Sequence, residues 1–226
     1  MNFRQLGSRL ILAAATAASL ALFLPAAPAA LARDETPGKF DFYVLSLSWS
    51  PTFCSGSRGK KSPEQCGLDK RFGFIVHGLW PQNETGYPEF CAAAGPRRIP
   101  EALGRRYLDI MPSIGLIAHQ WRKHGSCSGL DLEAYLNKTR QAFDRINLPE
   151  QLTGIANPSD YSAREIEQSF IGANPGLTAS AIAVSCERKR LEEVRICLTK
   201  DLTFRDCRDV DRKGCTLNQI TVPPAR

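Results

Sequence analysis

The chain of 226 residues is predicted to fold as a single domain of mixed helices and strands, stapled by disulfides. Three observations favour this class. Apolar residues alternate with polar ones in several short segments, which is typical of half-buried strands. Other segments carry apolar residues at helical spacing. Eight cysteines follow an N-terminal leader, and an even number in an exported chain indicates four disulfides, although this count leaves their pairing open.

The first 32 residues have the organisation of a secretory signal peptide. Arg4 and Arg9 form a positively charged start, residues 10–24 form an apolar run, and small residues around position 32 fit a cleavage site. The run is short for a membrane span. We therefore expect residues 1–32 to be removed. Residues 33–226 would then be one periplasmic or secreted domain, monomeric and not attached to a membrane.

The charge of the expected mature chain is mildly positive. Removing the two leader arginines from the 29 basic residues leaves 27 against 23 acidic residues, a net charge of +4. Such an excess suits a polyanionic substrate, but many mildly basic domains bind no nucleic acid. Charge alone therefore does not identify the substrate.

Two strands are predicted in the first half of the mature chain. Leucine and tryptophan alternate with serine over residues 45–50. Residues 72–77 alternate in the same way, with the phenylalanines expected to face the core. His77 would lie on the opposite face, at the end of its strand, because Gly78 and Pro81 are expected to turn the chain away.

Loops and helices are expected between the strands. Residues 54–69 and 82–100 have the composition of loops, and residues 101–110 could form a short helix. A second helix is expected from residue 113 through 124, ended by Gly125.

The second half of the chain alternates between helix and strand. Residues 131–146 have a clear amphipathic pattern, which favours a core-packing helix. Ser162 and Glu165 form a capping-box start for another helix. Residues 181–185 and 194–198 are predicted strands.

The chain has only three histidines, and they lie in two short motifs. His77 is in one, and His119 and His124 are in the other. Histidine has an unperturbed pKa near neutrality, which suits proton transfer. Helical spacing places His119 with Lys123 on one ridge and Gln120 with His124 on the next. We predict that the two motifs form one active site.

Metal and nucleophile chemistry fit the motifs poorly. The helix histidines are five residues apart, about 140° around a helix, whereas a zinc protease helix has them four apart with a glutamate between. Lys123 beside the second histidine also disfavours a metal. Ser126 is near a histidine, but no G-x-S-x-G elbow is present.

Phosphoryl transfer by two histidines, without a metal or other cofactor, fits better. A neutral histidine takes a proton from a hydroxyl, and a protonated one gives a proton to the leaving oxygen. A lysine and an amide would stabilise charge on the phosphoryl oxygens. A 2′-hydroxyl nucleophile would make the substrate RNA. Trp80 could stack on a base, with core packing an equal alternative, whereas Trp121 favours the core.

Residues 74–81 and 119–127 resemble the two active-site segments of the ribonuclease T2 family. Residues 43–51 and 196–201 resemble its first and C-terminal strands, and the alanine-rich leader resembles bacterial periplasmic members. This resemblance implies an α+β fold, with a central antiparallel β-sheet and helices packed around it. It also implies an endoribonuclease that cleaves single-stranded RNA by metal-independent transesterification, with 2′,3′-cyclic phosphate ends and low base specificity.

The resemblance also implies roles for single residues. His124 matches the general base and His77 the general acid. His119 matches a phosphate-binding histidine, Lys123 a cation that stabilises the pentacoordinate phosphorus, and Trp80 a base-stacking residue. The implied disulfides are Cys54–Cys66, Cys91–Cys127, Cys186–Cys215 and Cys197–Cys207.

Gln120 departs from the family, which usually has glutamate at this position. Glutamine can donate a hydrogen bond to a phosphoryl oxygen but lacks the charge that raises the pKa of a nearby histidine. We therefore expect an active enzyme with a pH optimum nearer neutral than glutamate would give. The alternative is an RNA-binding or regulatory protein of the same fold, with catalysis impaired by Gln120. Gln82 and Tyr87 are candidate substrate contacts.

Overall fold

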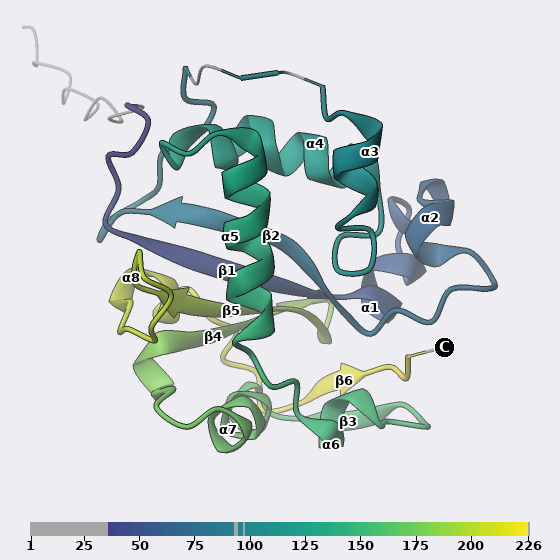
Figure 1. Ribbon diagram of the computed structural model, residues 1–226. Coiled ribbons are helices and arrows are strands. Elements are labelled where there is room, and N and C mark those ends of the chain that lie inside the picture. The colour runs from purple at the N-terminus through teal and green to yellow at the C-terminus, as the bar shows by residue number, and fades with distance from the viewer. Residues whose placement is uncertain (1–35, 93–94, 97, 226) are drawn as a thin grey trace, which may run out of the picture. The chain divides into compact units, whose positions relative to one another are not determined.

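A six-stranded sheet lies at the centre of the computed structural model, which describes residues 36–92, 95–96 and 98–225 (Figure 1). The leader expected at residues 1–32 lies outside the described residues. The strand order is β2-β1-β5-β6-β3, and β4 pairs with β5 off this path. All pairings are antiparallel except a single parallel pair between β5 and β6. The strands are β1 (Phe42–Trp49), β2 (Phe74–Gln82), β3 (Ser159–Tyr161), β4 (Ile182–Glu187), β5 (Arg190–Leu198) and β6 (Ile220–Val222).

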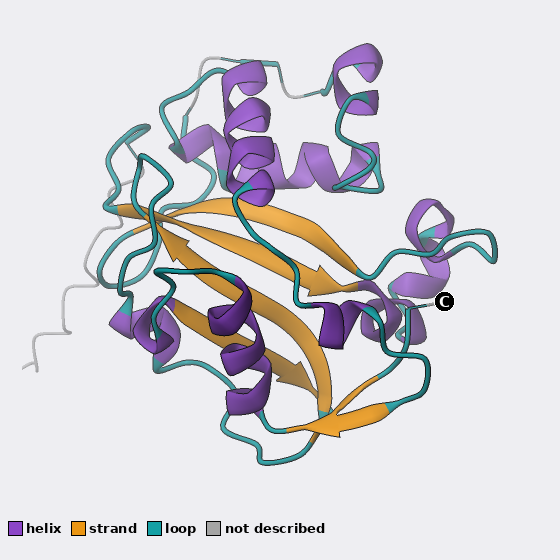
Figure 2. Cartoon of the chain, turned by 60° about the horizontal axis from the view of Figure 1, so that its bottom comes forward, coloured by secondary structure: helices purple, strands orange, loops and turns teal. Residues whose placement is uncertain are grey.

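Helices pack around this sheet, so the α+β prediction with a central antiparallel sheet is confirmed. Helices α4 and α5 lie against β2, and α7 lies against β4 (Figures 1 and 2). The predicted capping box of α7 is present. The helices are α1 (Ser50–Ser55), α2 (Pro63–Cys66), α3 (Glu101–Arg105), α4 (Ile114–Lys123), α5 (Leu132–Asp144), α6 (Glu150–Thr153), α7 (Ala163–Ala173) and α8 (Arg208–Asp211).

The two faces of the sheet have different roles. Leu45, Leu47 and Trp49 on β1 are buried in the main hydrophobic core, as their alternation predicted. Ser46 and Ser48 point to the other face, because successive side chains alternate along a strand. This second face carries fewer apolar residues and forms the floor of the cleft described below.

The prediction that the chain turns away after His77 is wrong. Strand β2 continues to Gln82, and Pro81 pairs with Tyr43 of β1. Proline is tolerated here because β2 is at the edge of the sheet. The register shifts between Leu47↔Val76 and Ser46↔Gly78, which leaves His77 as the extra residue of a β-bulge. His77 therefore reaches the second face from within the strand.

Other boundaries also differ from the sequence predictions. The expected loop at residues 54–69 contains the end of α1, a 3₁₀ turn η1 (Gly59–Lys61) and α2. The helix expected at 101–110 ends at Arg105, and α4 ends at Lys123 before a second 3₁₀ turn η2 (Gly125–Cys127). Strands β3 and β6 were missed, because three-residue strands carry almost no periodic signal.

The four disulfides have the pairing that the family resemblance implied: Cys54–Cys66, Cys91–Cys127, Cys186–Cys215 and Cys197–Cys207. Cys91–Cys127 ties the loop after β2 to the turn after α4. Trp121 is buried in the core, as expected, and its indole donates to the carbonyl of Pro96 at 3.0 Å. Within the described part of the chain, no helix has the length and apolar character needed to cross a membrane.

Candidate active site

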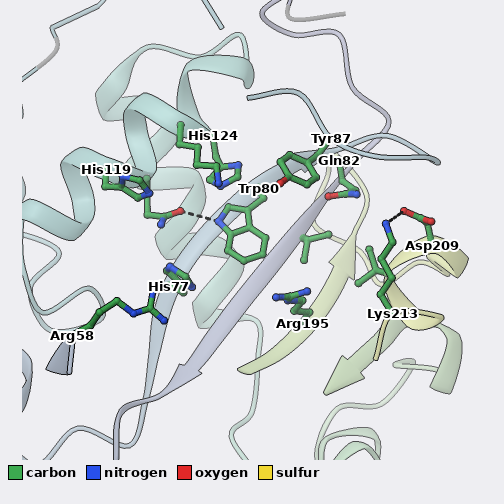
Figure 3. Close-up of a pocket in the computed structure, with 14 residues that line it drawn as sticks. Arg58, His77, Trp80, Gln82, Tyr87, His119, His124, Arg195, Asp209 and Lys213 are labelled. Atoms are coloured by element: carbon green, nitrogen blue, oxygen red, sulfur yellow. Dashed lines mark hydrogen bonds and ion pairs between the residues drawn. The ribbon is translucent and has the colours of Figure 1, made fainter. Parts of the chain in front are cut away.

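The three histidines meet in one cleft of about 380 Å³ (Figure 3). His77 comes from the bulge of β2, His119 from α4, and His124 caps the C-terminus of α4. The structure thus brings both predicted motifs together. The lining residues are Val44, Arg58, His77, Trp80, Gln82, Tyr87, His119, Gln120, Lys123, His124, Arg195, Asp209, Val210 and Lys213.

His124 forms a buried wall of this cleft. Its side chain is buried and its ring stacks on Trp80, with centroids 5.1 Å apart. Burial, followed by the positive charge of Lys123 and the neighbouring His77 and His119, lowers the pKa of His124 to about 3. Among the described residues, its Nδ1 has no hydrogen-bond partner. His124 is therefore neutral near pH 7, the state that a general base requires.

The low pKa of His124 bears on the optimum expected from Gln120. A base that stays neutral in mild acid remains able to accept a proton at lower pH. This pKa belongs to the chain with Gln120 and gives no comparison with glutamate, so an optimum nearer neutral than glutamate would give stays a prediction. Burial, which the sequence did not show, is the main cause of the low pKa of His124.

His77 lies on the other side of Trp80 and is held by a buried carboxylate. The side chain of His77 is 35% exposed, and its Nδ1 contacts Oε1 of Glu193 on β5 at hydrogen-bond distance. Oε2 of Glu193 accepts from Nε and Nη2 of Arg195 at 3.1 and 2.9 Å. Burial alone would raise the pKa of Glu193, but His77 and Arg195 outweigh burial and hold that pKa below its ordinary value.

Sequence reasoning missed Glu193 and Arg195. The available signal was a pair of glutamates directly before the predicted strand at 194–198 and an arginine within it, where charges are unusual.

Trp80 and Gln120 form the centre of the site. The indole Nε1 of Trp80 donates to Oε1 of Gln120 at 2.8 Å, and Gln120 is buried. This bond leaves the amide nitrogen of Gln120 as a donor. The ring of Trp80 lies edge-on to His77 at 5.4 Å, and the guanidinium of Arg195 is 5.5 Å from its centroid. Gly78 permits this arrangement, because a Cβ there would lie 2.4 Å from both bonded atoms.

His119 and Lys123 line the cleft from one ridge of α4, as the helical spacing predicted. Partial burial, followed by the charges of Lys123, Arg122 and His77, lowers the pKa of His119. Nζ of Lys123 lies 3.5 Å from Glu89 and 6.0 Å from the ring centroid of Tyr87. This ridge presents a cation and imidazole donors to the cleft.

The candidate substrate contacts Gln82 and Tyr87 also line the cleft. The amide of Gln82 is buried and donates to the carbonyl of Gly86 at 2.7 Å. Tyr87 is 36% exposed, and its ring centroid lies 5.9 Å from that of His124. Tyr87 is thus the more accessible of the two for a ligand.

The far wall of the cleft comes from residues that carried no recognisable motif. Asp209 on α8 accepts from Nζ of Lys213 at 2.7 Å, and both line the cleft (Figure 3). Arg58 enters from the loop before η1. Among the described residues that line the cleft, four basic side chains and three histidines stand against one carboxylate, so the cleft suits an anionic ligand.

Several known proteins are similar to this chain. The model of the ribonuclease T2 family matches residues 40–207. The chain is 40% identical over 123 residues to a probable ribonuclease of Haemophilus influenzae, covering 49% of this chain and 45% of that protein. It is 41% identical over 93 residues to a ribonuclease of Aeromonas hydrophila, covering 41% and 40%. The matched segments thus span less than half the length of these two relatives.

A longer match and two solved structures extend the likeness. The chain is 28% identical over 235 residues to ribonuclease I of Escherichia coli, covering 84% of this chain and 86% of that protein. An RNase-related protein from Calystegia sepium superposes with a TM-score of 0.67 at 22% identity, over 83% of this chain and 98% of that one. RNase NT, solved in complex with 5′-AMP, superposes with a TM-score of 0.61 at 22% identity, over 82% and 98%. The two structures show a shared fold.

Proposed function

Because the chain belongs to the ribonuclease T2 family, we propose that it is an endoribonuclease that cleaves single-stranded RNA by transesterification to 2′,3′-cyclic phosphate ends. One observation carries the proposal. A buried, neutral His124 and a carboxylate-bound His77 lie on opposite sides of Trp80 in one cleft. A base and an acid so placed can act on two oxygens of one phosphate.

The proposed reaction needs only these two proton transfers. His124 takes the proton of the 2′-hydroxyl as the 2′-oxygen attacks phosphorus. His77 gives a proton from Nε2, the nitrogen not bound to Glu193, to the departing 5′-oxygen as the P–O bond breaks. The products are a 2′,3′-cyclic phosphate and a free 5′-hydroxyl, and no protein nucleophile is used.

The ridge of His119 and Lys123 and the amide of Gln120 would stabilise the phosphoryl oxygens. Negative charge accumulates on these oxygens in the pentacoordinate state, and fixed donors lower its energy. Gln120 can donate because its oxygen, not its nitrogen, is bound to Trp80. Gln120 is therefore compatible with catalysis.

The shape of the cleft supports cleavage at an internal position of an RNA strand. A second hollow of about 490 Å³ adjoins the first and shares His77, Trp80, Arg58 and Arg195 with it. Nucleotides could thus lie on both sides of the reacting phosphate. Contacts by aromatic rings such as Tyr87 are tolerant of the base, which supports low base specificity.

We also propose that the mature enzyme is an exported, monomeric domain of residues 33–226. Four disulfides support export, because they persist in oxidising compartments such as the bacterial periplasm. Mass spectrometry of the purified native protein would locate its N-terminus, and light scattering would give its oligomeric state.

Incubation of the protein with RNA in excess EDTA tests the function. We expect 2′,3′-cyclic ends in the wild type, and a loss of at least about 10²-fold in rate for His77→Ala and for His124→Ala. Arg145→Ala, an exposed change outside the cleft, is the matched control and should retain full activity. RNA binding without turnover by the wild type would favour the alternative of a regulatory RNA-binding protein. Activity abolished by EDTA would contradict the metal-independent mechanism.

A further inference from the structure

A buried ion pair lies directly behind His77. Glu193 is only 4% exposed, and its two oxygens have separate partners, His77 on Oε1 and Arg195 on Oε2. Removing a carboxylate from water is strongly destabilising unless charges and hydrogen bonds compensate for it. Both compensating side chains line the cleft. The ion pair therefore belongs to the wall of the reaction site and not to the hydrophobic core.

The sheet is built so that this contact can form. His77 is on β2 and Glu193 on β5, with β1 between them, so the two strands are about 10 Å apart. The residue of β1 opposite Glu193 is Ser48, and the residue opposite Arg195 is Ser46. These small side chains leave the space above β1 open. The bulge at His77 directs the imidazole into that space.

From this geometry we propose that Glu193 is a positioning residue, which holds the imidazole of His77 in one tautomer and compensates its charge while it protonates the leaving oxygen. Nδ1–H of His77 donates to Glu193, so Nε2 alone faces the substrate. This proposal rests on the proposed function, since it assigns Glu193 a part in the same reaction. Arg195 fixes the second oxygen of the carboxylate and so prevents its rotation.

The charged and titratable neighbours of this pair come from four elements. They are Arg195 and Glu192 on β5, Arg58 before η1, His119 on α4, His124 at the end of α4 and Glu187 at the end of β4. Arg195 alone among them bonds to Glu193 within the described residues. A change at Glu193 should therefore act first through His77 and Arg195.

Substrates with different leaving groups can distinguish a positioning role of Glu193 toward His77 from a purely structural role of Glu193. A ribonucleoside leaving group needs a proton from His77, whereas p-nitrophenolate, a good leaving group, departs without one. We therefore compare a dinucleotide with the 3′-p-nitrophenyl phosphate ester of the same nucleoside. Glu193→Gln keeps the shape and removes the charge, and should lower kcat for the dinucleotide about 10- to 100-fold, with less than about threefold loss for the nitrophenyl ester.

The controls make the outcomes distinct. His77→Ala should show the same selectivity to a larger extent, and adding Glu193→Gln to it should cause little further loss. Glu167→Gln removes a half-buried carboxylate that accepts from the backbone of Val184, outside the cleft, and should change neither rate. Equal losses for both substrates in Glu193→Gln would overturn the positioning role. A His77→Ala variant that cleaves the dinucleotide normally would instead contradict the proposed function.

A measurement on the wild type covers the case in which Glu193→Gln does not fold. Histidine labelled with ¹⁵N gives only three ring systems in this chain. We expect His77 to be protonated at Nδ1, with a downfield proton signal from the bond to Glu193, and this signal should vanish in His77→Ala. The opposite tautomer, or the absence of that proton signal, would refute the proposal without any variant of Glu193.

Discussion

The buried ring of His124 makes folding stability sensitive to acid. The unfolded chain protonates His124 near its ordinary pKa of 6.5, whereas the folded chain resists protonation down to about 3. Between these values the unfolded state binds more protons, so stability falls as the pH falls through this window and is fully present above 6.5. At about pH 4.5, two pH units below the unfolded value, the loss is about 2.7 kcal/mol.

Replacing the titrating ring isolates this contribution. Urea denaturation with the disulfides intact gives the free energy of unfolding of the wild type and of His124→Phe at about pH 7.5 and about pH 4.5. Other groups titrate in both proteins, so the difference between their acid losses reports His124 alone. We expect the variant to lose about 2 to 3 kcal/mol less than the wild type. Equal losses in the two proteins would show that His124 is not held neutral by burial.

Three further predictions concern the groups around this base. Gln120→Glu places a carboxylate near His124, the proposed general base, and should raise the acid-side pKa of the kcat profile by about one unit, measured by pH–rate analysis. An unchanged pKa would contradict the electrostatic role of this position. Gly78→Ala should displace the Trp80 indole, because the alanine Cβ would lie 2.4 Å from the indole Nε1. We expect kcat to fall about tenfold or more. A normal kcat and unshifted tryptophan fluorescence would argue against that crowding. Replacing Cys91 and Cys127 with serine should lower the free energy of unfolding by about 2 to 4 kcal/mol, and an unchanged urea midpoint would show that this disulfide contributes little.

The elements with strong periodicity could be predicted from the sequence. Helix α5 buries the apolar face that its pattern predicted, and Leu45, Leu47 and Trp49 of β1 lie in the core as their alternation predicted. Strand β1 is more buried than a half-buried strand, because Phe42, Val44 and Ser46 on its second face are buried as well. The three histidines stood out because they share two short motifs. The continuation of β2 past His77 could not be inferred, because Gly78 and Pro81 ordinarily end a strand and their acceptance depends on the edge position of β2.

The unpredicted part of the site is the part that depends on strand order. Glu193 lies 116 residues beyond His77, and nothing local to either residue indicates that β5 will lie two strands from β2. The burial of His124 could not be predicted for a similar reason, because it depends on tertiary packing. The low pKa of His124 follows from the packing of Trp80 and α4 and not from its own sequence neighbours alone.

The bulge at His77 and the serines of β1 together explain how one sheet can serve both a core and a cleft. A regular strand would place His77 and Leu79 on the same face, because side chains alternate with a period of two. The extra residue lets Leu79 remain in the core while His77 and Trp80 both face the cleft. Deleting the bulge would therefore either bury the acid or expose Leu79. The fold thus requires the irregularity at the residue that the proposed reaction uses as its acid.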